Sequence, residues 1–413
     1  MVAAVVALCA AGTHAACAEL CWRRAPRSVR SEEGPQVSEQ PDNTTPLLRV
    51  EDLAVSFDNG DGPRIQAVDG ANLAVYPRQT VAVVGESGCG KSVTAMSLLG
   101  LVPSPPSRID RGKFVFQSSK GVVDLLKLDA TALRDIRGGD IAMIFQEPMT
   151  SLNPVYSIGE QILEAIRLHR GVSGSDAHKI AIAALKEVGI DDAEHRLKAY
   201  PHQFSGGMRQ RAMIAMALAC RPRLLLADEP TTALDVTVQK QILDLIGSLK
   251  DEHDMAVVLI THDLGVVAEY ADVVCVMYAG RVVEYAETPV LYQNPLHPYT
   301  RGLLACIPTL DQSQSTDEQL VTVSEVVNSE SQWTDFGSRL GQSGLDDLRP
   351  WWPWHDAPSS VVRSDSGTPE YDLTEVEPGH FVGLWRTKSV AEQVAPLRVR
   401  PVDLSTRRVL SEV

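Results

Sequence analysis

The chain has 413 residues, 44% of them hydrophobic and 22% charged, which is enough to bury a core in one large domain or two ordinary ones. Its formal net charge of -15 argues against a broad basic surface for nucleic acid, so we expect no nucleic-acid partner. Seven cysteines without C-x-x-C spacing predict a reduced chain rather than a disulfide scaffold.

The first 46 residues divide into an apolar start and a polar linker, and we expect both to be disordered. Residues 1–18 are apolar but lack a basic n-region, so they read either as a weak secretory signal or as an extension upstream of the true start. Residues 24–46 are rich in Pro, Ser and charge, which is typical of a linker.

From Leu47 the pattern changes to regular elements. Residues 47–57 alternate apolar and polar side chains as a half-buried strand does, and residues 65–77 predict further strand. Residues 80–85, TVAVVG, form a short β-branched run, and helical periodicity follows over residues 91–102.

The middle of the chain predicts consecutive helices followed by buried strands. Two amphipathic helices are expected over residues 158–188 and a third after the glycines at 206–207. The runs LLLAD (224–228) and AVVLIT (256–261) predict buried strands separated by a helix. Strands alternating with helices predict an α/β fold with a largely parallel core sheet, into which a helical subdomain is inserted.

A glycine-rich segment at the end of the TVAVVG run fits the phosphate-loop pattern G-x-x-x-x-G-K-[ST]. Its members are Gly85, Glu86, Ser87, Gly88, Cys89, Gly90, Lys91 and Ser92. Glycines let backbone N–H groups cradle phosphate oxygens, Lys91 supplies charge to the β- and γ-phosphates, and Ser92 can bind Mg²⁺. A chance match occurs in about one chain in a hundred, but the preceding strand and following helix argue against chance. Cys89 precedes a helix N-terminus, which favours its thiolate.

Two carboxylates and a histidine follow the later strand runs. Asp228 and Glu229 end the LLLAD run, where Asp228 can hold Mg²⁺ through water and Glu229 can polarise an attacking water. Alone, such a pair is as often a solvated turn. His262 follows the AVVLIT run at a strand end, where ligands of α/β sheets gather, and could contact a γ-phosphate. A lone histidine is more often structural.

The segment FSGGMRQR at 204–211 opens a helix with free N–H groups and a serine hydroxyl, which suits an anion but by itself indicates only a helix cap. It resembles the LSGGQ signature of ABC ATPases, with Phe204 and Met208 as mild departures. The order of phosphate loop, Gln146, signature, ADEP, TALD and ITHD over residues 47–308 matches that family. The resemblance implies a P-loop NTPase fold with a mixed core sheet, an antiparallel β subdomain and a helical subdomain at about 146–219.

The resemblance also implies a composite site formed by two chains arranged head to tail. The signature of one chain would meet the γ-phosphate held by Lys91 of the other, and Asp235 would lie in the loop that links the two sites. Gln146 would contact Mg²⁺ and water and sense the membrane partner. Phe57 would stack on adenine, although it is equally suited to the core. The signature residues are Ser205, Gly206, Gly207 and Met208.

Longer segments, among them NPLHPYTRGLL at 294–304, resemble the ATP-binding subunit of dipeptide and oligopeptide importers. This resemblance implies ATP and Mg²⁺ as ligands, hydrolysis of ATP, and a peripheral place on the cytoplasmic face of the plasma membrane. The implied partners are a second ATPase domain, identical or a sister subunit, membrane permeases and, indirectly, an extracytoplasmic solute-binding protein. A cytosolic site favours the extension interpretation of residues 1–18.

The extension at 309–413 is expected to be partly ordered or disordered. It has no cysteine after Cys306, so we expect no iron–sulfur cluster, although EVEPGHFV at 375–382 looks like a remnant of the subfamily's extension. The WWPWH run at 351–355 is either an aromatic binding patch or a local core.

Three alternatives to peptide import stay open. Relatives in the same subfamily take nickel or glutathione. A soluble ABC ATPase acting in translation or DNA repair would normally have two ATPase units or long coiled coils, and neither is found in this sequence. A non-catalytic binding module would not need Lys91, Asp228, Glu229 and His262 together.

Overall fold

The structure is a computed structural model, which describes residues 45–60, 62–146, 151–232, 234–307, 322–329, 331–334, 336, 348–357, 360–363 and 370–387. The disorder expected for residues 1–46 concerns a segment of which only residues 45 and 46 are described. Much of the expected extension at 309–413 also lies outside the described residues.

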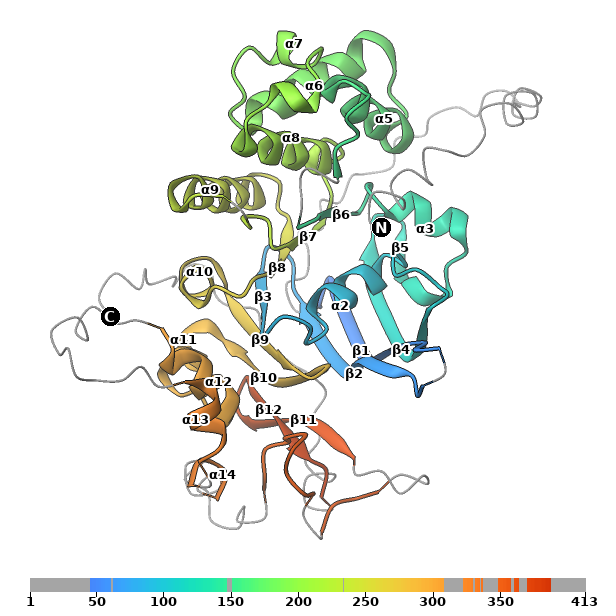
Figure 1. Cartoon of the computed structure of the whole chain (residues 1–413). Helices are drawn as coiled ribbons and strands as arrows, with labels where there is room; N and C mark the ends of the chain where they lie inside the picture. The colour runs from blue at the N-terminus through green and yellow to red at the C-terminus, as the bar shows by residue number, and fades with distance from the viewer. Residues whose placement is uncertain are drawn as a thin grey trace, which may run out of the picture.

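A large mixed sheet runs through the centre of the molecule (Figure 1). In spatial order its described strands are β11 (Tyr371–Glu377), β12 (His380–Trp385), β10 (Arg281–Glu287), β9 (Val273–Tyr278), β3 (Thr80–Val84), β8 (Ala256–Ile260), β7 (Leu224–Asp228) and β6 (Ile141–Ile144). The strands from β9 to β6 are parallel, and β10, β12 and β11 pair antiparallel at one end. The parallel strands β3, β7 and β8 are buried along their whole length, as their continuous apolar runs predict.

A second, antiparallel sheet lies beside the core sheet, on the right in Figure 1. Its spatial order is β2 (Ile65–Val75), β1 (Leu48–Phe57), β4 (Ser107–Ser118) and β5 (Gly121–Asp124). Helix α2 (Lys91–Leu98), the short 3-10 helix η1 (Leu125–Lys127) and α3 (Ala130–Ile136) accompany it. One hydrophobic cluster joins this sheet to the core through residues such as Phe114, Leu98 and Val81.

Consecutive helices between β6 and β7 form the group at the top of Figure 1. They are α5 (Ile158–Arg170), α6 (Gly174–Glu187), α7 (Ala193–Arg196), the 3-10 helix η2 (Pro201–Gln203) and α8 (Gly206–Leu218), and α9 (Val236–Glu252) follows β7. A capping box starts α5, where the Ser157 hydroxyl accepts from the Glu160 N–H and the Glu160 carboxylate accepts from the Ser157 N–H. Ile158, Ile162 and Ile166 then bury one face. The predicted fold class is confirmed.

The C-terminal elements lie at the bottom of Figure 1. They are α11 (Thr288–Gln293), α12 (Pro298–Ala305), α13 (Val323–Val327), α14 (Ser331–Thr334) and the β11–β12 hairpin, whereas α10 (Leu264–Tyr270) lies higher, beside the core sheet. The EVEPGHFV segment forms the turn of this hairpin, which extends the core sheet through β10. Trp351 and Trp352 are buried in an aromatic cluster, whereas Trp354 is 78% exposed. The WWPWH run therefore contributes mainly to a local core.

The same region contains a buried histidine whose ring bonds fix its tautomer. His297 Nδ1 accepts from the Tyr299 N–H at 3.1 Å, so Nε2 carries the proton and donates to the Trp351 carbonyl at 3.0 Å. Burial lowers the pKa of His297 to about 4, although the nearby Glu284 acts in the opposite direction. The folded chain therefore keeps this ring neutral at pH values where a solvated histidine is charged.

We predict a loss of stability in mild acid that depends on His297. Between pH 6.5, the ordinary value, and pH 4 the unfolded chain binds a proton that the folded chain excludes, so the free energy of unfolding decreases as the pH falls. From pH 6.5 to 4.5 this amounts to about 2 kcal/mol. His297→Asn keeps an acceptor for the Tyr299 N–H but cannot titrate. Urea unfolding at both pH values should therefore show a smaller loss in the variant, and equal losses would contradict the prediction.

Candidate active site

The predicted site residues gather at one edge of the core sheet. The carboxyl ends of the parallel strands β3, β6, β7 and β8 meet there, as parallel pairing requires. The phosphate loop follows β3, Gln146 lies just after β6, and Asp228 ends β7. His262 comes two residues after β8. Segments far apart in the sequence thus contribute to one site.

The phosphate loop needs glycine at two positions where the backbone is left-handed and close to another chain segment. Gly85 has φ 146°, and a Cβ there would lie 2.1 Å from the carbonyl oxygen of Met277. Gly90 has φ 104°, and its Cβ would lie 2.5 Å from the carbonyl oxygen of Ala67. Any side chain would force these segments apart. Residues 86–88 between them are exposed to solvent.

Lys91 begins α2 and lies beneath this loop. Its side chain is buried, and Nζ donates to the carbonyl oxygens of Gly85 at 2.8 Å and Glu86 at 2.9 Å. The loop thus surrounds the ammonium, which lies near the N-terminus of α2, the positive end of the helix dipole. Such a cradle of amides and one buried cation suits a phosphate chain.

Cys89 does not behave as its place in the sequence predicts. Its side chain is 4% exposed, and burial raises the pKa of the thiol above its ordinary value of 9.0, although Lys91 Nζ lies 3.8 Å away. The expectation that the thiolate is favoured is therefore wrong. Loss of solvation outweighs the attraction of the cation and the helix N-terminus.

Ser92 and Asp228 form an oxygen pair beside the loop. The Ser92 hydroxyl donates to Asp228 Oδ1 at 2.9 Å, and Asp228 is buried. Burial raises the pKa of Asp228, the Ser92 hydrogen bond lowers it, and the charge of Glu229 raises it further. Burial and a neighbouring carboxylate both disfavour the negative charge of Asp228, so a bound cation would stabilise that charge. Hydroxyl and carboxylate oxygens are ligands that Mg²⁺ prefers, so the pair fits this ion.

Glu229 occupies a constrained position at the start of the turn after β7. Its backbone has φ 46°, and its N–H donates to the carbonyl oxygen of Ile260 on β8 at 3.0 Å. The carboxylate accepts from Gln146 Nε2 at 3.0 Å and from the Thr232 hydroxyl at 2.9 Å. His262 Nδ1 lies 3.7 Å from Glu229 Oε1. The structure thus brings together the predicted residues Gln146, Glu229 and His262.

Two contacts of this turn were missed by the sequence analysis. Thr232 bonds to Glu229, and its place three residues further along the same turn was the only available signal. Gln210 on α8 is buried, and its Nε2 donates to the carbonyl oxygen of Pro230. This second bond links the signature helix to the turn that holds Glu229.

The signature residues lie away from the chain's own phosphate loop. Ser205 caps α8, where its Oγ accepts from the Met208 N–H at 3.3 Å, and both Ser205 and Gly206 are exposed. A Cβ on Gly207 would lie 3.0 Å from a Val238 methyl on α9. In Figure 1, α8 belongs to the upper helical group and is well separated from α2. The signature therefore presents its free N–H groups outside the phosphate site of its own chain.

Asp235 and Phe57 complete the predicted set. Asp235 is exposed and caps α9, with Oδ1 accepting from the Val238 N–H at 3.0 Å. Phe57 ends β1 and is half-buried against the hydrophobic cluster that contains Cys89. This packing suits the core interpretation of Phe57, and adenine stacking stays a prediction.

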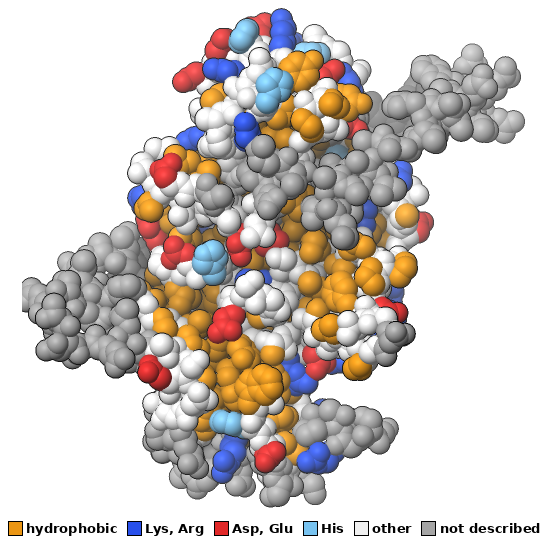
Figure 2. Space-filling view, viewed as in Figure 1, with side chains coloured by type: hydrophobic (Ala, Val, Ile, Leu, Met, Phe, Trp, Pro, Cys, Tyr) orange, Lys and Arg blue, Asp and Glu red, His pale blue; other side chains and the backbone are white. Residues whose placement is uncertain are grey.

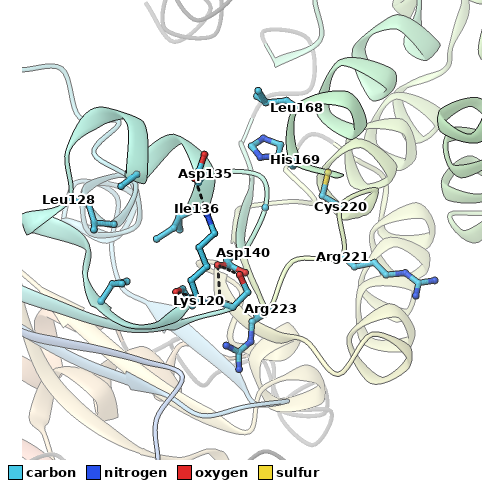
Figure 3. A pocket seen from close by; sticks show the side chains of 15 residues that line it. Lys120, Leu128, Asp135, Ile136, Asp140, Leu168, His169, Cys220, Arg221 and Arg223 are labelled. Carbon is cyan, nitrogen blue, oxygen red and sulfur yellow. Dashed lines mark hydrogen bonds and ion pairs between the residues drawn. The ribbon is translucent and has the colours of Figure 1, made fainter. Parts of the chain in front are cut away.

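A separate cavity of about 560 Å³ lies between β4, β5, α3, the end of α5 and the segment before β7 (Figure 3). None of the predicted nucleotide residues lines it. Figure 3 shows Lys120 reaching Asp135, at 3.0 Å, and Asp140 accepts from the N–H and hydroxyl of Ser119. Lys120, Asp135 and Asp140 are therefore bonded within the chain.

Within the described part of the chain, the helices are too short or too polar to cross a bilayer. No group of three or more His, Cys, Asp or Glu side chains arranged to hold a metal was found among those same residues.

Comparison with known families gives two matches. Residues 68–232 match the family described as "ABC transporter", and residues 283–332 match "Oligopeptide/dipeptide transporter, C-terminal region". The first match extends from within β2, through the phosphate loop, to the turn that holds Glu229. The second covers most of β10, all of α11, α12 and α13, and the first residues of α14.

Curated relatives and solved structures agree with these matches. The chain is 53% identical over 266 residues to the peptidoglycan transport ATP-binding protein YejF of Agrobacterium fabrum, covering 64% of this chain but only 48% of that protein. It is 51% identical over 265 residues to the dipeptide transport ATP-binding protein DppD of Bacillus subtilis, covering 64% of this chain and 78% of the relative. The dimeric post-hydrolysis structure of the ATP-binding cassette MJ0796 bound to ADP and Pi aligns with TM-score 0.51 and 28% identity, over 58% of this chain and 98% of the other. The chain therefore belongs to the ATP-binding proteins of ABC transporters, in the oligopeptide/dipeptide importer subfamily.

Proposed function

We propose that this protein binds and hydrolyses ATP to energise an ABC importer for dipeptides or oligopeptides. The observation that carries the proposal is the junction of Lys91, the Ser92–Asp228 pair and the Gln146–Glu229–His262 group at one sheet edge. The names of the relatives and the match at residues 283–332 support peptides rather than nickel or glutathione as cargo.

In the proposed reaction, the loop amides and Lys91 bind the phosphates of ATP. Ser92 and Asp228 would hold Mg²⁺, which would supply positive charge to the phosphates. Glu229 accepts a proton from the attacking water as that water's oxygen bonds to the γ-phosphorus, and ADP leaves with the electrons of the broken P–O bond. Gln146 and Thr232 orient the Glu229 carboxylate, and His262, whose Nδ1 lies 3.7 Å from Glu229 Oε1, would stabilise the phosphate oxygens.

The separation of the signature from the phosphate loop supports a site completed by a second ATPase domain. Ser205, Gly206 and Gly207 of one chain would bind the γ-phosphate held by the other chain. The same phosphate would then be gripped from both sides, and its loss would let the two domains part. The dimeric cassette that aligns with this chain supports such an assembly.

A membrane permease is the second class of partner in this proposal. Val155 and Tyr156 precede α5 and are 72% and 50% exposed, so two adjacent apolar side chains face solvent there. Figure 2 shows hydrophobic side chains also gathered over the core below the helical group. Docking beside Gln146 and α5 would place the chain on the cytoplasmic face of the plasma membrane, and a solute-binding protein would act indirectly from the other side.

The cargo is tested by reconstitution with the permease and solute-binding protein that co-purify from membranes. We expect peptides to stimulate ATP hydrolysis, because cargo-loaded binding protein would promote closure of the ATPase domains. Stimulation by nickel or glutathione alone would contradict peptide import. Co-purification with ribosomes or DNA in place of a permease would contradict transport as a whole.

Glu229→Gln should bind ATP but hydrolyse it at least about a hundredfold more slowly, because the amide cannot accept the proton. Glu252→Gln, at the exposed end of α9, is the matched control and should hydrolyse ATP normally. Phosphate release measures the rate, and size-exclusion chromatography with ATP should show a persistent dimer for Glu229→Gln. A native rate in this variant would remove Glu229 as the base.

Lys91→Ala should weaken ATP binding by about tenfold or more, the effect expected when one charged hydrogen-bond donor is lost. The exposed Lys113, on β4, provides the control substitution Lys113→Ala. Equilibrium binding of a fluorescent ATP analogue measures the affinity of both variants. Equal affinities would contradict the role given to Lys91.

A further inference from the structure

Tyr299, which lies outside every motif of the nucleotide site, contacts the phosphate loop. Its hydroxyl accepts a hydrogen bond from the backbone N–H of Glu86 at 3.1 Å. We propose that Tyr299 is a positioning residue for nucleotide binding, and that the C-terminal segment holds it in place through buried hydrogen bonds. This inference rests on the proposed function, since it takes the loop to be the ATP site.

The contact between Tyr299 and Glu86 lies at the start of the phosphate loop, just after β3 ends. Glu86 follows Gly85, whose backbone is left-handed, and residues 86–88 are exposed. Lys91 Nζ donates to the carbonyl oxygen of Glu86 at 2.9 Å, but bound phosphates would attract the same ammonium. In this proposal the phosphates bind the other amides of the loop, and the Glu86 N–H keeps its bond to Tyr299. We therefore expect it to persist when nucleotide is bound.

The ring of Tyr299 is fixed by aromatic neighbours. It is fully buried and lies 4.6 Å from the ring of Tyr278, which ends β9 next to the loop. Trp352, from the C-terminal segment, stacks on Tyr278 with centroids 4.3 Å apart and planes at 18°, and its centroid is 5.9 Å from Tyr299. Burial raises the pKa of Tyr299 well above its ordinary value, so the hydroxyl stays neutral.

The backbone of Tyr299 is anchored by a run of buried polar groups. Its N–H donates to His297 Nδ1, and His297 Nε2 donates to the carbonyl oxygen of Trp351. The backbone N–H of His297 donates to Glu284 Oε2 at 3.0 Å, and His380 Nε2 lies 2.7 Å from Glu284 Oε1. His297, Glu284 and His380 are all fully buried. Hydrogen bonds therefore connect the phosphate loop to β10 and to the β11–β12 hairpin.

Such a connection would act through pre-organisation of the loop. A loop already held in its binding conformation loses less conformational entropy when ATP binds, so its affinity is higher. Removing only the Tyr299 hydroxyl would leave the ring packing intact and release the Glu86 N–H. The chemical step itself would not change, because Tyr299 does not touch Glu229 or the residues that orient it.

The test compares Tyr299→Phe with Tyr285→Phe. Tyr285 is also fully buried, and its hydroxyl donates to the carbonyl oxygen of Ala74 at 2.7 Å, away from the loop. For Tyr299→Phe we expect the KM for ATP to rise about twofold to tenfold, the range expected for one neutral hydrogen bond, with kcat unchanged. Hydrogen exchange at the loop amides should also be faster. Tyr285→Phe should lose stability to a similar extent, but its KM and loop exchange should match the wild type.

The outcomes separate this proposal from the proposed function. A wild-type protein that binds no ATP would overturn both. If the wild type binds ATP and Tyr299→Phe shows an unchanged KM, or the same rise as Tyr285→Phe, the positioning role is overturned while ATP binding stands. Should Tyr299→Phe not fold, Trp352→Phe decides, because it loosens the packing of Tyr299 and should also raise KM. An unchanged KM in that variant would overturn the proposal.

Discussion

The close approach of three backbone segments at the phosphate loop is the constraint on which the rest of the site depends. Gly85 lies against the carbonyl of Met277 on β9, and Gly90 lies against the carbonyl of Ala67 on β2. The loop is thus held between the core sheet and the antiparallel sheet, and its conformation cannot be changed without separating them. Because α2 starts directly after the loop, the same contacts also fix where Lys91 and Ser92 enter the site.

The charged groups at the sheet edge follow from this arrangement. Asp228 accepts its hydrogen bond from Ser92, the last residue of the phosphate-loop motif, so the orientation of the loop also sets the proposed metal site. Glu229 is oriented separately, by its N–H bond to Ile260 and by Gln146 and Thr232. Binding of phosphate and activation of water thus rely on different neighbours. A substitution can therefore weaken nucleotide binding, which changes KM, without changing the activation of water, which sets kcat.

The sequence predicted those parts of the site that depend on local order along the chain. Asp228, Glu229 and His262 were found because they lie at the ends of buried strand runs, where side chains of a parallel sheet converge, whereas Gln146 was found only through the order of motifs that resembles the ABC ATPases. Tyr299 was not found as a loop contact, because it lies 213 residues from its partner Glu86 and only packing brings them together. Cys89 was misjudged for the same reason, since its neighbours in the sequence indicate a thiolate whereas burial, which comes from distant segments, raises its pKa.

The C-terminal hairpin shows how far this long-range packing extends. Its composition predicts little regular structure, yet β12 pairs with β10 and continues the sheet that carries the phosphate loop on β3. The pairing also buries Glu284 against His380, and that carboxylate is satisfied only with donors from two segments, the His380 ring and the N–H groups of Leu296 and His297. An uncompensated carboxylate at this depth would be costly, so hairpin, β10 and the start of α12 stabilise one another. The described part of the C-terminal segment is in this way joined to the ATPase core through the fully buried side chains of Glu284 and His380.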